Sequence, residues 1–375
     1  MAGLYIHIPF CRSRCIYCGF YSTTDLVLRQ RYVEAVCREM RLRSGKENAG
    51  HEKTDIQTIY IGGGTPSLLT LEQLGGLLDE ARNVFDVDTN AEVTVEVNPD
   101  DVTEVLATGL RAVGVNRVSM GAQTFDTSRL RFLNRRHTAS QVKEAVGTLR
   151  RSGFDNISID MMYGFPDETL ESWQQDIDTA LGLEVEHLSA YSLMYEEGTP
   201  LYQLMNEGQI QTCNEELERS MYYTLVDRLS AAGYEHYELS NFAKPGRRSR
   251  HNNSYWKDVP YIGLGAAAHS YNGRCRQWNI SDLRHYIKGI ENGQPLTEQD
   301  EFDTDTRYND RIAVALRTCE GMSLGELTSS QQDYLLRSAQ RYMSDGLLEL
   351  KNGSIKLTRK GLFVSDMIMA DLMKV

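Results

Sequence analysis

The sequence lacks the features that would place it in several specialised classes of protein. It has no low-complexity tract, and no apolar run approaches the roughly 20 residues that a membrane-spanning helix needs. The start, MAGLYIHI, has no lysine or arginine, no long apolar core and no small-residue cleavage site, so we expect no signal peptide and a cytoplasmic location. Acidic residues outnumber basic ones, 52 to 40. The formal net charge of −12 argues against nucleic acid or an anionic membrane as partner, because both attract positive surfaces.

The sequence also lacks the cysteine motifs of common zinc sites and of covalent heme attachment. The sequence has seven cysteines, no second C-x2-C pair to complete a common zinc site, and no C-x2-C-H motif for covalent c-type heme. Four cysteines are scattered, but Cys11, Cys15 and Cys18 lie within eight residues, directly after a predicted strand. In a reducing compartment this clustering favours a metal or redox site over disulfides. Three thiolates can ligate three irons of a four-iron cluster and leave the fourth iron open, whereas zinc usually takes four ligands.

Short β-rich runs alternate with longer stretches of helical periodicity, which predicts a parallel sheet with crossover helices. The predicted strands are residues 4–8, 56–61, 92–97, 117–120, 156–161 and 187–193. Amphipathic segments such as 26–42, 71–85 and 170–183 are long enough for one helix per crossover. The fold class is therefore α/β, with six units that fit a partial (β/α)6 TIM-like barrel. Such barrels carry their chemistry where the strands end.

The pattern changes after about residue 200, and we expect three parts. The barrel core covers 1–200, and an extension over 201–299 contains a helix at 215–232, the run 234–239 and a cationic loop at 244–250. Helices at 306–317 and 331–343, with a hairpin at 347–357 across Asn352 and Gly353, predict a small winged-helix-like α+β domain over 300–375. That last part has 12 acidic and 10 basic residues, so packing or protein binding is expected rather than DNA binding.

Several motifs resemble a known family. They are YIHIPFC at residues 5–11, the C-x3-C-x2-C spacing, IGGGTP at 61–66 and EVNP at 96–99. Together they resemble the radical S-adenosylmethionine (SAM) group that contains oxygen-independent coproporphyrinogen III oxidase, over nearly the whole chain. Within this group the sequence is most similar to the heme chaperones of the HemW family. The oxidase pattern ends in a further cysteine where this chain has Phe20, the oxidase extension ahead of Tyr5 is not expected here, and HNNSYW at 251–256 matches the H-N-x-x-Y-W signature of the chaperones.

The resemblance implies a [4Fe-4S] cluster on Cys11, Cys15 and Cys18, with SAM bound at the open iron. It also implies a set of SAM-binding residues: Tyr5, Tyr17, Gly63, Gly64, Thr65, Glu96, Gln123, Arg135 and Asp160. The residues alone leave other interpretations open. The glycines suit a plain turn as well as a close approach to a ligand, Glu96 suits a solvated strand edge, and the two tyrosines suit a core. Asp160 is an isolated charge in an apolar strand, where burial demands a partner.

His251 is the candidate heme ligand. A lone histidine more often has a structural role, but this one follows three arginines of the loop at 247–250 and precedes Tyr255 and Trp256. Together they would offer an iron ligand, cations for propionates and an aromatic surface. A porphyrinogen with its carboxylates would fit the same groups, so this segment does not separate chaperone from oxidase.

Three hypotheses remain. The first is a heme chaperone that delivers heme to an acceptor protein, which could be a peripheral membrane protein. The second is an enzyme that cleaves SAM to a radical and acts on a propionate of a tetrapyrrole. The third is a radical SAM enzyme with another substrate. Phe20 favours the first, so a non-enzymatic role is the main expectation.

Overall fold

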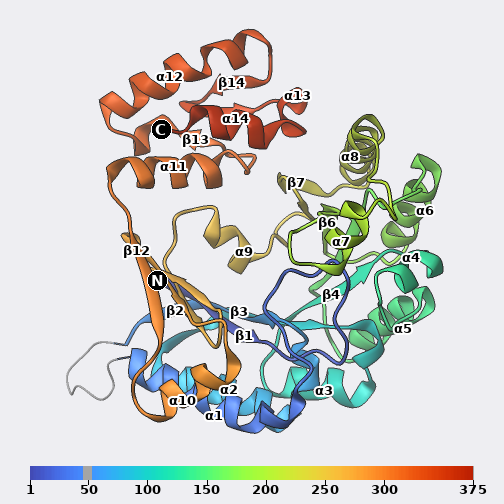
Figure 1. The fold of residues 1–375 in the computed structure, drawn as a ribbon, viewed down its shortest axis with the longest axis vertical. Coiled ribbons are helices and arrows are strands. Elements are labelled where there is room, and N and C mark those ends of the chain that lie inside the picture. Colours follow the sequence, from blue (N-terminus) through green and yellow to red (C-terminus); the bar gives the residue numbers. More distant parts are fainter. Residues whose placement is uncertain (45–52, 375) are drawn as a thin grey trace.

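A twisted sheet with helices along its outer face forms most of the molecule in the computed structural model, which describes residues 1–44 and 53–374 (Figure 1). Six parallel strands occupy its centre, and each overlaps a predicted one, although β3 begins six residues earlier than predicted. They are β1 (Ala2–Ile8), β2 (Asp55–Gly63), β3 (Asp86–Val97), β4 (Arg117–Gln123), β5 (Ile157–Tyr163) and β6 (His187–Ser192). The sheet curves but does not close, so the predicted partial barrel is confirmed.

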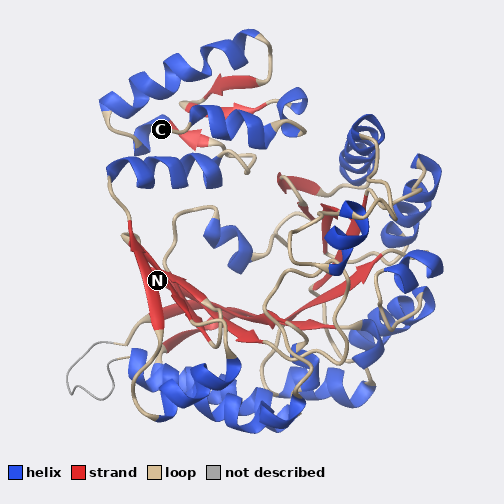
Figure 2. Ribbon diagram, viewed as in Figure 1, coloured by secondary structure: helices blue, strands red, loops and turns tan. Residues whose placement is uncertain are grey.

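Crossover helices cover the convex face of the sheet (Figure 2). They are α1 (Arg29–Arg43), α2 (Leu71–Val84), α3 (Glu104–Ala112), α4 (Thr127–Phe132), α5 (Ala139–Arg151) and α6 (Leu170–Leu181). The start of α2 shows why these helices begin where they do: Thr70 accepts a hydrogen bond from the backbone of Gln73, whose side chain caps Thr70 in return. The predicted helix at 26–42 begins instead with a 3-10 turn, Leu26–Leu28, and becomes α-helical at Arg29.

The inner face of the barrel is polar. Side chains alternate along each strand, so Leu4, Ile6 and Ile8 of β1 pack in the apolar core under the helices, while Tyr5 and His7 point to the other face. The same alternation turns polar side chains of β2 to β6 inward, among them Thr58, Tyr60, Glu96, Arg117, Ser119, Asp160 and Ser189. This alternation supplies the functional groups of the cavity described below.

The sheet extends beyond the six predicted strands to a total of twelve. Next to β6 lie β8 (Asn241–Ala243) and β7 (Glu235–Glu238), and next to β1 lie β9 (Tyr261–Leu264), β10 (His269–Tyr271), β11 (Cys275–Asn279) and β12 (Thr297–Glu301). Of these only the run at 234–239 was predicted. Helices α7 (Pro200–Asn206), α8 (Glu215–Ala231) and α10 (Leu283–Glu291) accompany them. The short helix α9 (Arg250–Tyr255) differs, because it lies on the concave side of the sheet, opposite α1 and α2 (Figure 1).

The C-terminal part is a small α+β unit with its own three-stranded antiparallel sheet. Its elements are α11 (Thr304–Ala315), β13 (Met322–Ser323), α12 (Ser329–Ser344), β14 (Leu348–Lys351), β15 (Ser354–Leu357), α13 (Arg359–Leu362) and α14 (Ser365–Leu372). The predicted hairpin turns at Asn352 and Gly353, whose φ angles of 53° and 77° suit a tight hairpin turn. A separate apolar core supports our proposal of a domain boundary near residue 300. None of the helices within 1–44 and 53–374 is long and apolar enough to span a membrane.

Candidate functional site

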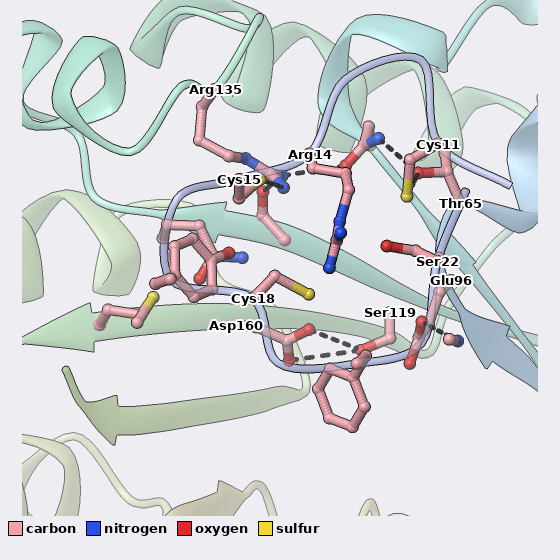
Figure 3. Close-up of a pocket in the computed structure, with 18 of the residues that line it drawn as sticks. Cys11, Arg14, Cys15, Cys18, Ser22, Thr65, Glu96, Ser119, Arg135 and Asp160 are labelled. Carbon is pink, nitrogen blue, oxygen red and sulfur yellow. Dashed lines mark hydrogen bonds between the residues drawn. The ribbon is translucent and has the colours of Figure 1, made fainter. Parts of the chain in front are cut away.

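A cavity of about 420 Å³ opens where the central strands end (Figure 3). Its walls come from the loop after β1 and from the ends of β2 to β6. Eleven of the predicted site residues line it: Cys11, Cys15, Cys18, Tyr17, Gly63, Gly64, Thr65, Glu96, Gln123, Arg135 and Asp160. The chain therefore brings the cysteine motif, the glycine motif and two carboxylates into one space, although they are far apart in the sequence.

The cysteine loop is held by backbone hydrogen bonds rather than by regular secondary structure. At its base, the Cys11 amide donates to the Thr23 carbonyl at 2.9 Å, and the Thr23 amide donates to Pro9 at 2.7 Å. Further along, the Asn134 side chain donates to the Arg14 carbonyl at 2.8 Å. These contacts fix the loop over the ends of the strands.

The three thiols suit an iron–sulfur cluster better than a single metal ion. In the described parts of the chain, no three metal-binding side chains converge on one point, but a four-iron cluster is larger than an ion and needs no such convergence. Thr65 donates to Cys11 Sγ at 3.6 Å, and Arg135 donates to Cys15 Sγ at 3.6 Å. Such donors stabilise metal-bound thiolates. Arg14 extends between Cys11 and Cys18 and is exposed, so it can move aside (Figure 3).

Burial keeps the Cys11 and Cys18 thiols protonated in the absence of a metal. It raises the pKa of Cys11 and raises the pKa of Cys18 to about 11, and neighbouring cysteines add to both shifts. A bound metal displaces such protons, so the affinity for the metal increases with pH. The donor set therefore fits a cluster with three protein ligands.

The glycine motif makes room for the groups beside it. A Cβ on Gly62 would lie 2.8 Å from the Glu96 carboxyl carbon, and one on Gly64 would lie 2.8 Å from the Ile8 carbonyl oxygen. Gly63 has a φ of 109°, and a Cβ there would meet the His7 ring at 2.4 Å. The glycines are therefore needed at this turn, and they leave the Gly63 amide facing Glu96.

Glu96 is the most constrained carboxylate of the cavity. Tyr60 donates its hydroxyl proton to Glu96 Oε1 at 2.7 Å, and the Gly63 amide donates to Oε2 at 2.9 Å. Burial raises the pKa of Glu96 to about 7, although both hydrogen bonds act in the opposite direction. The side chain can therefore change charge near neutral pH when a ligand binds.

Asp160 lies on β5 and Glu96 on β3, with β4 between them, and both side chains line the cavity. Ser119, between them on β4, donates to Asp160 at 3.3 Å. Burial raises the pKa of Asp160, while the Ser189 hydroxyl and the charge of Arg117 oppose the shift. The two carboxylates thus share one polar wall, and each raises the cost of ionising the other.

Arg135 joins the cysteine loop to this wall. One guanidinium nitrogen donates to Asn98 Oδ1 at 2.9 Å and to the Gly121 carbonyl at 2.6 Å, while another reaches Cys15. Gln123, at the end of β4, has a φ of 65°, a conformation that side chains rarely adopt outside constrained sites.

Two predicted residues lie behind the cavity instead of lining it. Tyr5 is one layer deeper in the barrel, where its hydroxyl contacts His7 Nδ1 at 2.9 Å. His251 is fully buried, with Nδ1 2.8 Å from Thr58 Oγ1 and Nε2 2.9 Å from the Tyr255 hydroxyl. Burial lowers the pKa of His251 to about 3, so its ring is neutral. Both ring nitrogens are engaged, and an iron atom could bind only after one of these hydrogen bonds breaks.

Two of the three arginines before His251 are ion-paired. Arg247 pairs with Asp155 at 3.2 Å, and Arg248 pairs with Glu235 at 3.0 Å and with Glu320 at 2.7 Å. Carboxylates of this chain thus already neutralise Arg247 and Arg248, the first two cations expected to meet heme propionates.

Comparison with known proteins identifies the family. Residues 5–180 match the model of the radical SAM superfamily, and residues 302–364 match the HemN C-terminal domain. The heme chaperone HemW of Bacillus subtilis is 37% identical, with 96% of each chain covered. The HemW of Mycobacterium tuberculosis strain H37Rv is 32% identical over 99% of this chain and 94% of its own. The chain belongs to the HemW family. The solved structure of the coproporphyrinogen III oxidase HemN of Escherichia coli has the same fold, with a TM-score of 0.83 at 22% identity, covering 100% of this chain and 90% of that one.

The site of this HemW family member contains residues that sequence reasoning missed. Tyr60 and Asn98 line the cavity, and Arg117 lies beneath it on the inward face of β4. Arg117 is 1% exposed, and none of its three guanidinium nitrogens has a hydrogen-bond partner among the described residues. A charged residue within the strand at 117–120, two positions before Ser119, was the available signal.

We predict that Arg117 favours the ionised forms of Glu96 and Asp160. Arg117→Met should raise the pKa of both carboxyls, because an opposite charge favours the ionised form and its loss removes that effect. Arg117→Lys should restore most of the difference. NMR titration of 13C-labelled glutamate, with Glu96→Gln to assign the signal, measures the shift. An unchanged titration in Arg117→Met would show that the guanidinium does not act on Glu96.

Proposed function

We propose that the chain is a heme chaperone that carries a [4Fe-4S] cluster and SAM. Several bacterial relatives are named heme chaperones, among them one that is 37% identical over 96% of the chain. The observation that carries the cofactor assignment is the shared cavity of Cys11, Cys15 and Cys18 with the glycine turn and two buried carboxylates. A cytoplasmic location, and an acceptor at a membrane surface, stay predictions from the sequence.

The residues of the cavity match the chemistry of SAM. Its sulfonium and ammonium charges and its ribose hydroxyls complement the carboxylates Glu96 and Asp160, and its own carboxylate complements a guanidinium such as Arg135. When bound, a cluster with an open iron supplies an electron for cleavage of a carbon–sulfur bond of SAM. The protein groups orient the ligand and, through Glu96, can release a proton when its positive charge arrives.

We predict that the cluster depends on the three-cysteine loop alone. Cys15→Ser should abolish a reconstituted four-iron cluster, because the loss of one of three thiolates leaves the cluster without adequate support. Cys213→Ser is the control, since Cys213 lies outside the loop and does not line the cavity. Iron and sulfide analysis after anaerobic reconstitution measures the cluster content of both variants and the wild type. Full iron content in Cys15→Ser would refute the ligand assignment.

Heme has two candidate docking places. His251 stays a predicted ligand, but it must first be uncovered. The mouth of the cavity offers a more accessible surface, where Phe20, Tyr191 and Met194 are 69%, 40% and 61% exposed. Large apolar side chains gathered on one exposed rim usually mark a binding surface, and a macrocycle is flat and apolar enough to cover them.

We predict that these rim residues bind heme. The double variant Phe20→Ser, Met194→Ser should bind hemin at least about tenfold more weakly, because it removes two apolar contacts of roughly 1 kcal/mol or more each. Met367→Ser is a matched control, as Met367 is 53% exposed and lies in α14, away from the cavity. Titration of hemin, followed at the Soret band, measures both. Equal affinities in the double variant and the wild type would exclude the rim.

The alternative function is that of a coproporphyrinogen III oxidase, favoured only by the common fold. We predict that the reconstituted protein with SAM and a reductant does not decarboxylate coproporphyrinogen III, because Phe20 stands where the oxidase pattern has a cysteine. The oxidase itself serves as the positive control. Product formation over multiple turnovers would overturn the chaperone assignment, since a common fold alone is compatible with both functions.

A further inference from the structure

Helix α9, which contains the first five residues of the H-N-x-x-Y-W segment, is anchored to the inner face of the barrel. Glu92 on β3 is buried and accepts hydrogen bonds from the backbone amides of Arg250 at 3.1 Å and His251 at 3.0 Å. Ser249 caps the same helix. A buried carboxylate therefore fixes where the helix begins, and with it the position of the His251 side chain.

The His251 ring fills a space that the barrel leaves for it. Thr58 of β2 and Tyr255 of α9 hold its two nitrogens at 2.8 and 2.9 Å. On β1, a Cβ at Gly3 would lie 3.2 Å from His251 Cε1, a tighter contact than most, so glycine leaves room for the ring. The side chain is thus a packed and hydrogen-bonded part of the barrel interior.

From this place His251 contacts the residue that holds Glu96. Its ring stacks on Tyr60, with centroids 5.2 Å apart and planes 25° from parallel. The Tyr60 hydroxyl donates to Glu96 at 2.7 Å, and Glu96 accepts from the Gly63 amide at 2.9 Å. An unbroken line of contacts therefore runs from α9 to the glycine turn of the cavity.

We propose that His251 is a positioning residue for SAM binding, which acts by holding Tyr60 and, through it, Glu96. The inference rests on the SAM site proposed above. It gives the H-N-x-x-Y-W segment a role in the cofactor site that does not require His251 to bind iron. A neutral ring suits this role, since burial and the nearby charge of Arg117 both lower the pKa of His251. A protonated ring would donate from both nitrogens and lose its single acceptor contact.

The test is a double-mutant cycle on the dissociation constant of SAM, measured by calorimetry on the reconstituted full chain. His251→Ala and Tyr60→Phe should each weaken binding by about tenfold, as expected when a hydrogen bond to a charged group is weakened or lost. Because His251 acts through the Tyr60 hydroxyl, the double variant should be hardly weaker than Tyr60→Phe. Loss of general stability would not produce this non-additivity. His285→Ala, at an exposed position of α10, is the control and should bind SAM as the wild type does.

Three results would overturn the inference. The first is wild-type SAM affinity in His251→Ala, and the second is effects that multiply in the double variant to about a hundredfold. The third is a selective loss of hemin binding in His251→Ala with SAM binding intact, which would instead assign the histidine to heme. Tyr60→Phe keeps the ring and its packing, so the cycle retains one informative variant if His251→Ala folds poorly. Failure of the wild type to bind SAM would instead refute the SAM site of the proposed function. The wild-type titration alone shows this, so the two failures are distinguishable.

Discussion

The structure of the cavity depends on the burial of one carboxylate, that of Glu96. A carboxylate inside a barrel needs hydrogen-bond donors, and here Tyr60 and the Gly63 amide supply them. Meeting that need explains several features of the sequence at once: Gly62 leaves space for the carboxyl group, and Gly63 adopts a left-handed conformation. Loss of water around the buried carboxyl group raises the pKa of Glu96 to about 7. A cationic ligand that binds nearby can therefore change its charge.

Parallel topology explains why the cysteines and the carboxylates meet. All six central strands end at the same edge, so the loop after β1 lies above the inward side chains of β3 and β5. Arg135 then links the cysteine loop to the sheet, with Cys15 on one side and the Gly121 carbonyl of β4 on the other. A cluster bound to the loop would therefore lie next to a ligand bound at the strand ends. Radical SAM chemistry requires this contact between cluster and SAM.

The sequence predicts much of this because the relevant signals are local. Alternation along a strand and the spacing of Cys11, Cys15 and Cys18 need no knowledge of distant residues. Strands β8 and β10 have only three residues, too few for a pattern, β12 is exposed along its whole length, and α9 has only six residues. The ion pairs of Arg247 and Arg248 could not be predicted, because their partners Asp155, Glu235 and Glu320 are far away in the sequence. The burial of His251 likewise depends on contacts with β1 and β2 that no local pattern reveals.

The central claim is that the cysteine loop holds a cluster whose open iron faces a SAM site in the same cavity. Electron paramagnetic resonance of the reduced, reconstituted protein tests it most directly, because the spectrum of a cluster responds to the ligands of its irons. The account predicts that adding SAM changes the g values of the cluster signal, and that Glu96→Gln requires more SAM for the same change. A cluster spectrum that stays identical at saturating SAM would contradict it.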